Sequence, residues 1–319
     1  MGNTLHAPHQ HIKVRNEKER FLIELFDTLW ERYRGRMDYV RKYESLIAQH
    51  KATFVNDHIA FRTIACQKPT TGLFMISRVF EALGYSTANC YEFPDKHFSS
   101  IHFEHPNPQF PKLFITQLKT WELSARAQQI IHEAMATHRP PLTDEALGTL
   151  AQIETAAPAA HADLLKSLVR YFEELPWALP QKKDVLELDK ESQFAAWVLV
   201  NGYDVNHFTA SVNSHGVPTL DDVEKVQAAM IGAGIPMKKE IEGERGTKLR
   251  QTSTEAAVIP VQVKENGKTV AIPWTYAYFE IADRPLYKNP ATGKMERFEA
   301  FLGPQATNLF DMTKLKTGN

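Results

Sequence analysis

The stretch FVNDHIAFRTI, Phe54 to Ile64, alternates side chains in the way typical of a β-strand. Because successive side chains of a strand point to opposite faces, His58 and Arg62 share one face. A possible metal ligand and a cation suited to binding an acid therefore project from the same side. A second stretch, DVNHFTASV from Asp204 to Val212, carries His207 at the matching place. The sequence thus predicts two copies of one strand, each offering a histidine to a shared cavity.

The composition narrows the class of protein. The 319 residues, 43% of them apolar, suffice for a large buried core. Because the 37 basic and 38 acidic residues nearly cancel, neither a nucleic-acid partner nor an anionic membrane surface is expected. The two cysteines, Cys66 and Cys90, make no disulfide framework and no zinc-type spacing, which favours a reducing, cytoplasmic location. No secretory signal and no apolar run of about 18 residues is found, and the oligomeric state stays open.

The N-terminal part, residues 1–50, is predicted to be a polar leader followed by helices. Three of the 13 histidines (His6, His9 and His11) stand in this leader, where we expect a solvated tail rather than a metal-scavenging tract. Apolar residues recur every three or four positions from Glu17 to His50, which predicts helix, interrupted at Arg34-Gly35-Arg36.

Residues 51–120 are predicted to form a β-α-β-β-β module. Its helix is expected over Leu73–Leu83, with Gly84 as the residue that ends it. Its four strands are expected at 54–64, 86–91, 97–105 and 112–118.

A helical insert is predicted for residues 121–203, with breaks at Pro140-Pro141 and at Pro176 to Pro180. Residues 204–283 then repeat the first module. The predicted helix, 220–231, has Thr219 as its N-cap, and the strands are expected at 248–252, 257–263 and 273–282, with Asn266-Gly267 forming a hairpin turn. A glycine ends the helix at nearly the same distance from each histidine, which indicates an internal repeat. Residues 284–319 are predicted to be an irregular tail of one integrated α+β domain.

The last strand of the second module carries Glu280 within PWTYAYFEIA, which is otherwise almost wholly apolar and aromatic. Burying such a carboxylate costs several kcal/mol unless it is paired or bound to metal. With His58 and His207 it makes the two-histidine, one-carboxylate set of non-haem Fe(II) oxygenases, and zinc accepts the same ligands. Two plainer interpretations stay open, namely hydrogen-bonded core histidines and an ion pair of Glu280 with Arg284 or a lysine.

Other polar residues are weaker candidates for the cavity. Gln117 is aligned with Glu280 in the repeat and is predicted to face the cavity, contacting water or ligands rather than metal. A rival metal set consists of His97, His102 and His105, but the first two fall on opposite faces of a strand. One of these two histidines is expected to line the cavity.

The spacing of Arg62 from His58 along the strand favours a role in substrate binding. Four residues along a strand span about 13 Å, and a guanidinium leaning back would lie roughly 6–8 Å from a metal at His58, as estimated from that rise. This distance suits a substrate that binds metal at one end and carries a second carboxylate, which arginine binds bidentately. A salt bridge closing the cup is the alternative. Arg250 and Gln251, in GTKLRQTST, are further candidates for substrate contact.

Several motifs taken together resemble those of the 2-oxoadipate dioxygenase/decarboxylase family, also called hydroxyglutarate synthases, of vicinal-oxygen-chelate type. The likeness runs from about Phe54 to Thr313 and omits part of the helical insert. The motifs are FVNDHIAFRTI (54–64), GYSTANCYEFPDKHFSSIHFEHP (84–106), PKLFITQL (111–118), VNHFT (205–209), KLRQTST (248–254), PWTYAYFEIADR (273–284) and RFEAFLGPQATNLFDMT (297–313).

The resemblance implies an α+β fold of two vicinal-oxygen-chelate-like modules cupped around a metal. It also implies an Fe(II) enzyme that uses O2 to convert 2-oxoadipate to D-2-hydroxyglutarate and CO2, a step of lysine catabolism. The family's ligands correspond to His58, His207 and Glu280, and its substrate-binding arginine to Arg62. This arginine is expected to hold the distal carboxylate during the reaction.

Two places depart from the family's pattern. The family's C-terminal loop, which approaches the substrate, corresponds to Leu302–Ala306, where Gly303, Pro304 and Gln305 differ from the expected residues. Gln305 is nevertheless predicted to contact the substrate. Relatives often carry glutamate at the place of Gln117, so the difference bears on the exact substrate.

Other functions remain for the same fold. A glyoxalase-like isomerase or hydrolase would use Zn or Ni and would consume no O2. A protein that only binds a small acid would need no set of three metal ligands. A scaffold built on the helical insert has no positive support in the sequence.

Overall fold

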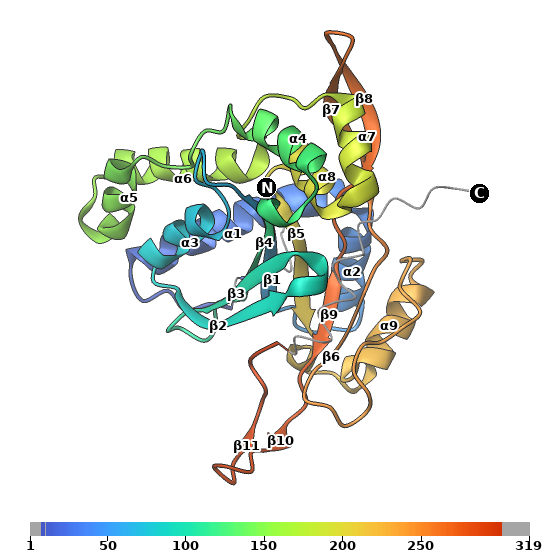
Figure 1. Cartoon of the computed structure of the whole chain (residues 1–319). Helices are drawn as coiled ribbons and strands as arrows, with labels where there is room; N and C mark the ends of the chain where they lie inside the picture. Colours follow the sequence, from blue (N-terminus) through green and yellow to red (C-terminus); the bar gives the residue numbers. More distant parts are fainter. Residues whose placement is uncertain (1–7, 10, 302–319) are drawn as a thin grey trace.

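A seven-stranded mixed sheet forms the centre of the molecule, with helices packed around it (Figure 1). The computed structural model describes residues 8–9 and 11–301. The strand order is β2-β3-β4-β1-β5-β9-β6. The strands are β1 (Asn56–Ala65), β2 (Ser86–Phe93), β3 (Phe98–Glu104), β4 (Lys112–Lys119), β5 (Val205–Ser211), β6 (Arg250–Ser253), β7 (Val258–Glu265), β8 (Lys268–Thr275), β9 (Glu280–Asp283), β10 (Tyr287–Lys288) and β11 (Met295–Glu296).

The helices fall into an N-terminal pair, one helix in each module, and a group between the modules. No helix in the described ranges is long and apolar enough to cross a bilayer. The helices are α1 (Glu17–Arg36), α2 (Asp38–Gln49), α3 (Leu73–Ala82), α4 (Ala125–Met135), α5 (Asp144–Ala151), α6 (Pro158–Glu173), α7 (Lys182–Glu191), α8 (Gln193–Asn201) and α9 (Val223–Gly232).

One face of the sheet is covered by an aromatic core that joins it to the helices. Phe61 of β1 lies 5.6 Å, centroid to centroid, from Phe80 of α3, which in turn contacts Phe26 of α1. Because strand side chains alternate, the residues beside Phe61, Ala60 and Arg62, point to the opposite face. That opposite face forms the inner surface of the cup.

The N-terminal segment differs from the prediction of a solvated leader. His9 is fully buried, and its Nδ1 lies 2.8 Å from Asp27 Oδ1 on α1, so the chain is anchored here. His6 lies outside the described residues. The break between the first two helices falls at Met37, one residue after the predicted interruption.

The two modules meet through their first strands. β1 pairs antiparallel with β5, while β4 runs parallel to β1 and β9 runs parallel to β5. Each half therefore places its last strand beside its first, and the two halves face each other across the centre of one sheet. This arrangement confirms the predicted α+β fold of paired modules.

The second module is built differently from the prediction. The Asn266-Gly267 turn forms as expected, with φ of 52° and 77°, but its strands β7 and β8 make a separate two-stranded sheet that projects from the body (Figure 1). The stretch predicted as one strand, 273–282, is divided between β8 and β9. The carbonyls of Tyr276 and Tyr278 accept hydrogen bonds from the side chains of Trp197 and Tyr33, which interrupts the ladder.

The place of the missing sheet strand in the second module is taken by irregular backbone. Met237 and Glu242 bridge to Thr254 and Gln251 at the edge of β6. The helix of this module also begins later than predicted. Asp222, not Thr219, is the N-cap of α9, because its Oδ1 accepts the backbone N–H of Lys225 at 2.8 Å.

Candidate metal centre

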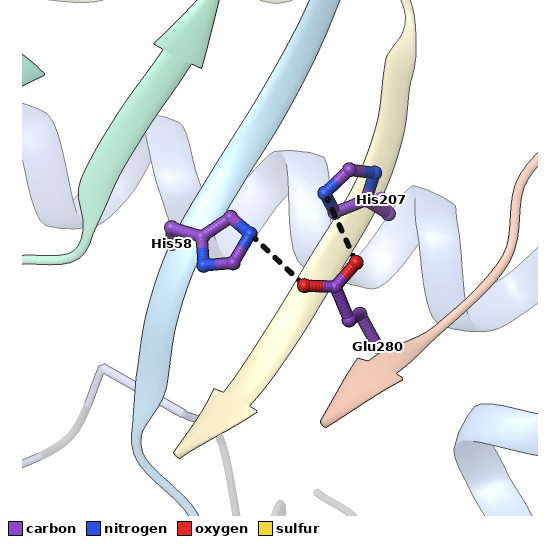
Figure 2. Close-up of side chains that lie close together, drawn as sticks. All are labelled: His58, His207 and Glu280. Carbon is purple, nitrogen blue, oxygen red and sulfur yellow. Dashed lines mark ion pairs between the residues drawn. The ribbon is translucent and has the colours of Figure 1, made fainter. Parts of the chain in front are cut away.

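His58, His207 and Glu280 converge at the centre of the sheet from three adjacent strands, β1, β5 and β9 (Figure 2). Glu280 Oε1 lies 3.4 Å from His58 Nε2, and Oε2 lies 3.8 Å from His207 Nε2. All three side chains are buried, and one potential ligand atom of each lies within 4.8 Å of the others. Ligand atoms bound at about 2.1 Å from one ion are separated by roughly 3.0–3.4 Å, so a small closure would complete a metal site.

The strand register explains why these residues meet. Thr209 of β5 is paired with His58 on one side and with Glu280 on the other. Side chains directly opposite each other point to the same face, so all three lie on the inner face of the cup. His207, two residues before Thr209 on β5, is paired with Ala60 and lies on the same face. The triad therefore depends on the antiparallel pairing of β1 with β5 across the module boundary and on the parallel pairing of β5 with β9.

Two β-bulges give each histidine a partner from its own strand. The register between β1 and β5 shifts once between Asn56 and His58 and again between Ala60 and Phe61, which leaves Asp57 and Asn206 as the extra residues. A bulge re-aims a side chain that would otherwise point to the other face. Asp57 Oδ2 lies 2.8 Å from His58 Nδ1, and Asn206 Oδ1 lies 3.1 Å from His207 Nδ1.

These contacts fix the chemistry of the two rings. An oxygen acceptor at Nδ1 favours the proton there, so Nε2 is the nitrogen that a neutral ring offers to a metal beside Glu280. In the described structure the hydroxyl of Thr209 lies 3.0 Å from His58 Nε2. Sequence reasoning had not identified Asp57 and Asn206, although an Asx-His dipeptide in both repeated strands was a signal that could have found them.

The first of these partners is itself held by an arginine. Arg284 donates to Asp57 through Nε at 2.9 Å and through Nη2 at 3.0 Å, and both side chains are buried. Arg284 also donates to the carbonyls of Phe298 and Ala300. Arg284 thus pairs with Asp57 rather than with Glu280, which answers the alternative left open by the sequence.

Glu280 fits a cation better than any partner in the described structure. The residue is fully buried, and neither carboxylate oxygen makes a hydrogen bond of good geometry with a described residue. A buried carboxylate in this state is costly unless a cation binds it. With two imidazole nitrogens beside it, the donor set suits Fe(II) or zinc, and no other group of three such residues is found in the described ranges.

The pKa values follow the same electrostatics. Burial lowers the pKa of His58, but the hydrogen bond with Asp57 and the nearby Glu280 outweigh it, so the net shift is upward. Burial first, then His58 and Arg62, hold the pKa of His207 well below its ordinary value, so this ring is neutral and ready to bind a metal. For Asp57, burial opposes ionisation, but Arg284 outweighs it and the pKa lies well below its usual range.

A cavity of about 30 Å³ lies between Arg62 and the two histidines of the triad. The guanidinium carbon of Arg62 lies 4.9 Å from the centroid of Phe194 and 5.2 Å from that of Trp197, both on α8. The cavity is lined by His58, Ala60, Phe61, Arg62, Phe114, Thr116, Asn206, His207, Tyr278 and Phe301. The structure thus brings Arg62 and two of the predicted metal ligands to one enclosed space.

Phe301 accounts for much of the closure of this cavity. Its ring lies 4.9 Å from that of His58, edge on, and 4.8 Å from that of Phe114. The remaining space holds about one water molecule, so a six-carbon diacid requires these side chains to move. The C-terminal loop predicted to approach the substrate, Leu302–Ala306, includes Gln305 and lies outside the described residues.

Gln117 does not face the cavity, contrary to the prediction. It is paired with Thr63, on the side of the sheet opposite to Arg62, and its Oε1 accepts the backbone N–H of Leu73 at the start of α3. Glu280 is paired with Thr209, which lies two residues after His207. The residue two after His58 is Ala60, and its partner is Phe114. Phe114, and not Gln117, is therefore the residue of the first module equivalent to Glu280.

Arg250 also lies away from the triad. It donates two hydrogen bonds to Glu224 of α9, at 2.8 and 2.6 Å, and is paired with Asp283 on the outer face of β6. This position does not suit substrate contact. Gln251 is on the inner face and donates to Glu242 Oε2 at 3.1 Å, but it does not line the cavity.

The rival histidines are dispersed. His97 is half exposed and lies 3.0 Å from Glu122, while His105 packs on Tyr85. His102 is buried on the inner face against Phe301, and burial and Lys112 lower its pKa to about 3. Its Nε2 lies 3.5 Å from Glu104 Oε1, and neither of its nitrogens makes a hydrogen bond of good geometry with a described residue.

A comparison with protein families adds an independent result. The model of the 2-oxoadipate dioxygenase/decarboxylase family matches residues 25–304, most of the chain. The chain belongs to this family. Two relatives are similar to it over 81% of its length: the 2-oxoadipate dioxygenase/decarboxylase of Arabidopsis thaliana, a chloroplastic protein (27% identity, 67% of that protein), and that of Oryza sativa subsp. japonica (26%, 68%).

Solved structures of other proteins share the fold. The hydroxyglutarate synthase of Oryza sativa in complex with 2-oxoadipate superposes with a TM-score of 0.75 at 23% identity, covering 98% of each chain. A protein of Ralstonia eutropha JMP134 described as belonging to the glyoxalase superfamily gives a TM-score of 0.77 at 22% identity, covering 88% of this chain and 89% of that one. At these identities the likeness confirms the vicinal-oxygen-chelate-like architecture.

Proposed function

We propose that this chain is an Fe(II)-dependent enzyme that converts 2-oxoadipate and O2 to D-2-hydroxyglutarate and CO2, a step of lysine catabolism. Family membership supports the reaction, and the structure of the rice relative with 2-oxoadipate supports the substrate class. The observation that carries the proposal for this chain is the shared cavity of Arg62, His58 and His207. A 2-oxo diacid has two ends, and the cavity offers a different binding group to each.

The metal would be held by His58, His207 and Glu280. Both histidines present Nε2 because Asp57 and Asn206 occupy Nδ1, and Glu280 supplies a buried carboxylate. With only three protein ligands, a bound ion would keep positions open for the 2-oxo acid and for O2, and it would supply the redox chemistry.

Arg62 would hold the distal carboxylate. Its guanidinium is flanked by the faces of Phe194 and Trp197, which fixes its plane without neutralising its charge. Because the residue lies on β1, its distance from His58 is set by the sheet rather than by a loop. The fork of an arginine binds a carboxylate bidentately, so the acid is held in one orientation during the reaction.

Enclosure would protect the reaction from water. Phe114, Tyr278 and Phe301 close the cavity around the space between the triad and Arg62. In a site of low dielectric, the attraction between Arg62 and a carboxylate is stronger than in water. The cytoplasmic location and the division into segments at 50, 120, 203 and 283 remain predictions from the sequence.

The test is metal loading followed by oxygen uptake. The protein is stripped of metal, loaded anaerobically with Fe(II), and given O2 with each of a series of 2-oxo acids. We expect one O2 consumed and one CO2 released for each 2-oxoadipate, with 2-hydroxyglutarate of D configuration as the product. No uptake with any 2-oxo acid, or turnover with Zn or Ni and without O2, would reject the proposal in favour of an isomerase or hydrolase.

A further inference from the structure

The two bulged residues, Asp57 and Asn206, each place an oxygen beside Nδ1 of the following histidine. They differ in whether a polar atom of the side chain is left without a hydrogen bond. Asp57 accepts from His58 and uses both carboxylate oxygens for Arg284. Asn206 uses Oδ1 for His207, which leaves its amide Nδ2. This nitrogen is buried and makes no hydrogen bond with any residue of the described ranges.

The orientation of the Asn206 amide follows from the role of His207. A ring that presents Nε2 to a metal carries its proton on Nδ1, so the group facing Nδ1 must be an acceptor. Oδ1 of Asn206 therefore faces the ring, and Nδ2 is the atom left for another partner. Asn206 lines the cavity that also holds His58 and Arg62.

We propose that Asn206 is a substrate-binding residue whose Nδ2 donates a hydrogen bond to an oxygen of the acid held between the metal triad and Arg62. The inference rests on the proposed function, which places an acid in this cavity. A buried donor without an acceptor is costly, and a bound carboxylate or keto oxygen removes that cost. The register places Asn206 between the strand positions of His207 and Val205, next to the segment of β1 that carries Arg62.

The difference between the two halves then has a reason. An aspartate is tolerated beside His58 because Arg284 neutralises it. An aspartate beside His207 would present a negative charge, and no donor, to an anionic substrate. The neutral amide at position 206 keeps the acceptor that His207 needs and adds the donor that the acid needs.

The substitution Asn206→Asp separates these two tasks, because it keeps an oxygen for His207 and removes the donor. Metal affinity is measured by calorimetry on the stripped protein, and the affinity for 2-oxoadipate is measured anaerobically on the metal-saturated protein. We expect metal affinity within a few-fold of wild type and substrate affinity about 10- to 100-fold weaker, as for a lost hydrogen bond to a charged group. The same substitution at the exposed Asn89 of β2 is the control and should change neither value.

A second variant, Asn206→Ala, guards against misfolding of the first. At saturating metal it should also bind 2-oxoadipate about 10- to 100-fold more weakly. Substrate affinity equal to wild type in either folded variant would overturn the inference and leave Asn206 with a positioning role only. Failure of the wild-type protein to bind any 2-oxo acid would instead reject the proposed function, so the two failures are distinguishable.

Discussion

At the scale of single residues, the unusual feature is a fully buried glutamate between two buried histidines. Glu280 has no hydrogen bond of good geometry within the described structure, and the nearest ring nitrogens are Nε2 of His58 at 3.4 Å and Nε2 of His207 at 3.8 Å. The charge that makes Glu280 unfavourable in an apolar strand is the property that makes it a ligand. A residue of this kind is better explained by function than by stability.

The triad can be tested one residue at a time. Replacing His58, His207 or Glu280 by alanine removes one of three ligands, so we expect Fe(II) affinity to fall at least about 100-fold and oxygen uptake to disappear. Circular dichroism should show the fold kept in each variant. Calorimetric titration with Fe(II) is the measurement, and full metal occupancy in any one variant would show that the residue is not a ligand.

At the scale of elements, the ion pair between Asp57 and Arg284 joins the bulge of β1 to the chain that follows β9. Both partners are buried, so removing one leaves the other charge unpaired. We expect Arg284→Ala to lower the free energy of unfolding of the metal-free protein by about 3–5 kcal/mol. Urea denaturation measures this change.

The matched control for this pair removes both charges. The double variant Asp57→Asn, Arg284→Met should be more stable than Arg284→Ala alone, because no unpaired charge remains. If the two variants lose the same stability, the ion pair is not what holds the bulge, and the packing of Arg284 on Phe301 is the larger contribution.

The same scale shows what the sequence could predict. Most strand and helix positions of the first module followed from alternation and from Gly84, because each of its strands pairs with a neighbour in the same sheet. In the second module the Asn266-Gly267 turn was identified correctly, but its strands were assigned to the wrong sheet. Local turn chemistry specifies a hairpin and not where it packs, since that depends on contacts such as those of Trp197 and Tyr33 with the chain before β9.

Register was the second limit. His58, Arg62 and Glu280 could be placed on one face because the period of a strand is two. Gln117 was misplaced because β4 and β9 were aligned with an error of an odd number of residues. Such an error moves a side chain to the other face of the sheet. The bulges at Asp57 and Asn206 are insertions of one residue, which an alternating pattern cannot reveal.

At the scale of the whole molecule, the stability of the metal-free protein depends on whether the buried acidic groups are charged or neutral. Burial raises the pKa of Glu242 to about 7, with the nearby Glu280 acting in the same direction. A raised carboxyl pKa means that its contribution to stability is fully present below the unfolded value, near pH 4.5, and is lost as pH rises through 7. The neutral form is the one that suits the folded metal-free protein.

This predicts a pH-dependent gain from Glu242→Gln, which keeps an acceptor for Gln251. We expect the metal-free variant and wild type to be equally stable near pH 4.5 and the variant to be more stable at about pH 8, by on the order of 1 kcal/mol. Thermal unfolding across this range measures it, with the exposed Glu244→Gln as the control. A gain that is the same at every pH would mean that the charge of Glu242 is not its cause.

The account as a whole depends on one claim, that the triad and Arg62 bind the two ends of one diacid in a single cavity. The most direct measurement compares kcat/KM for 2-oxoadipate, 2-oxoglutarate and 2-oxohexanoate in wild type and in Arg62→Lys. We predict that wild type ranks them in that order, with 2-oxohexanoate lowest because a monoacid has no distal carboxylate for the fork of Arg62 to bind. Arg62→Lys should lose most activity toward 2-oxoadipate, since a point charge does not reproduce the fork. Equal turnover of 2-oxohexanoate and 2-oxoadipate by wild type would contradict the claim.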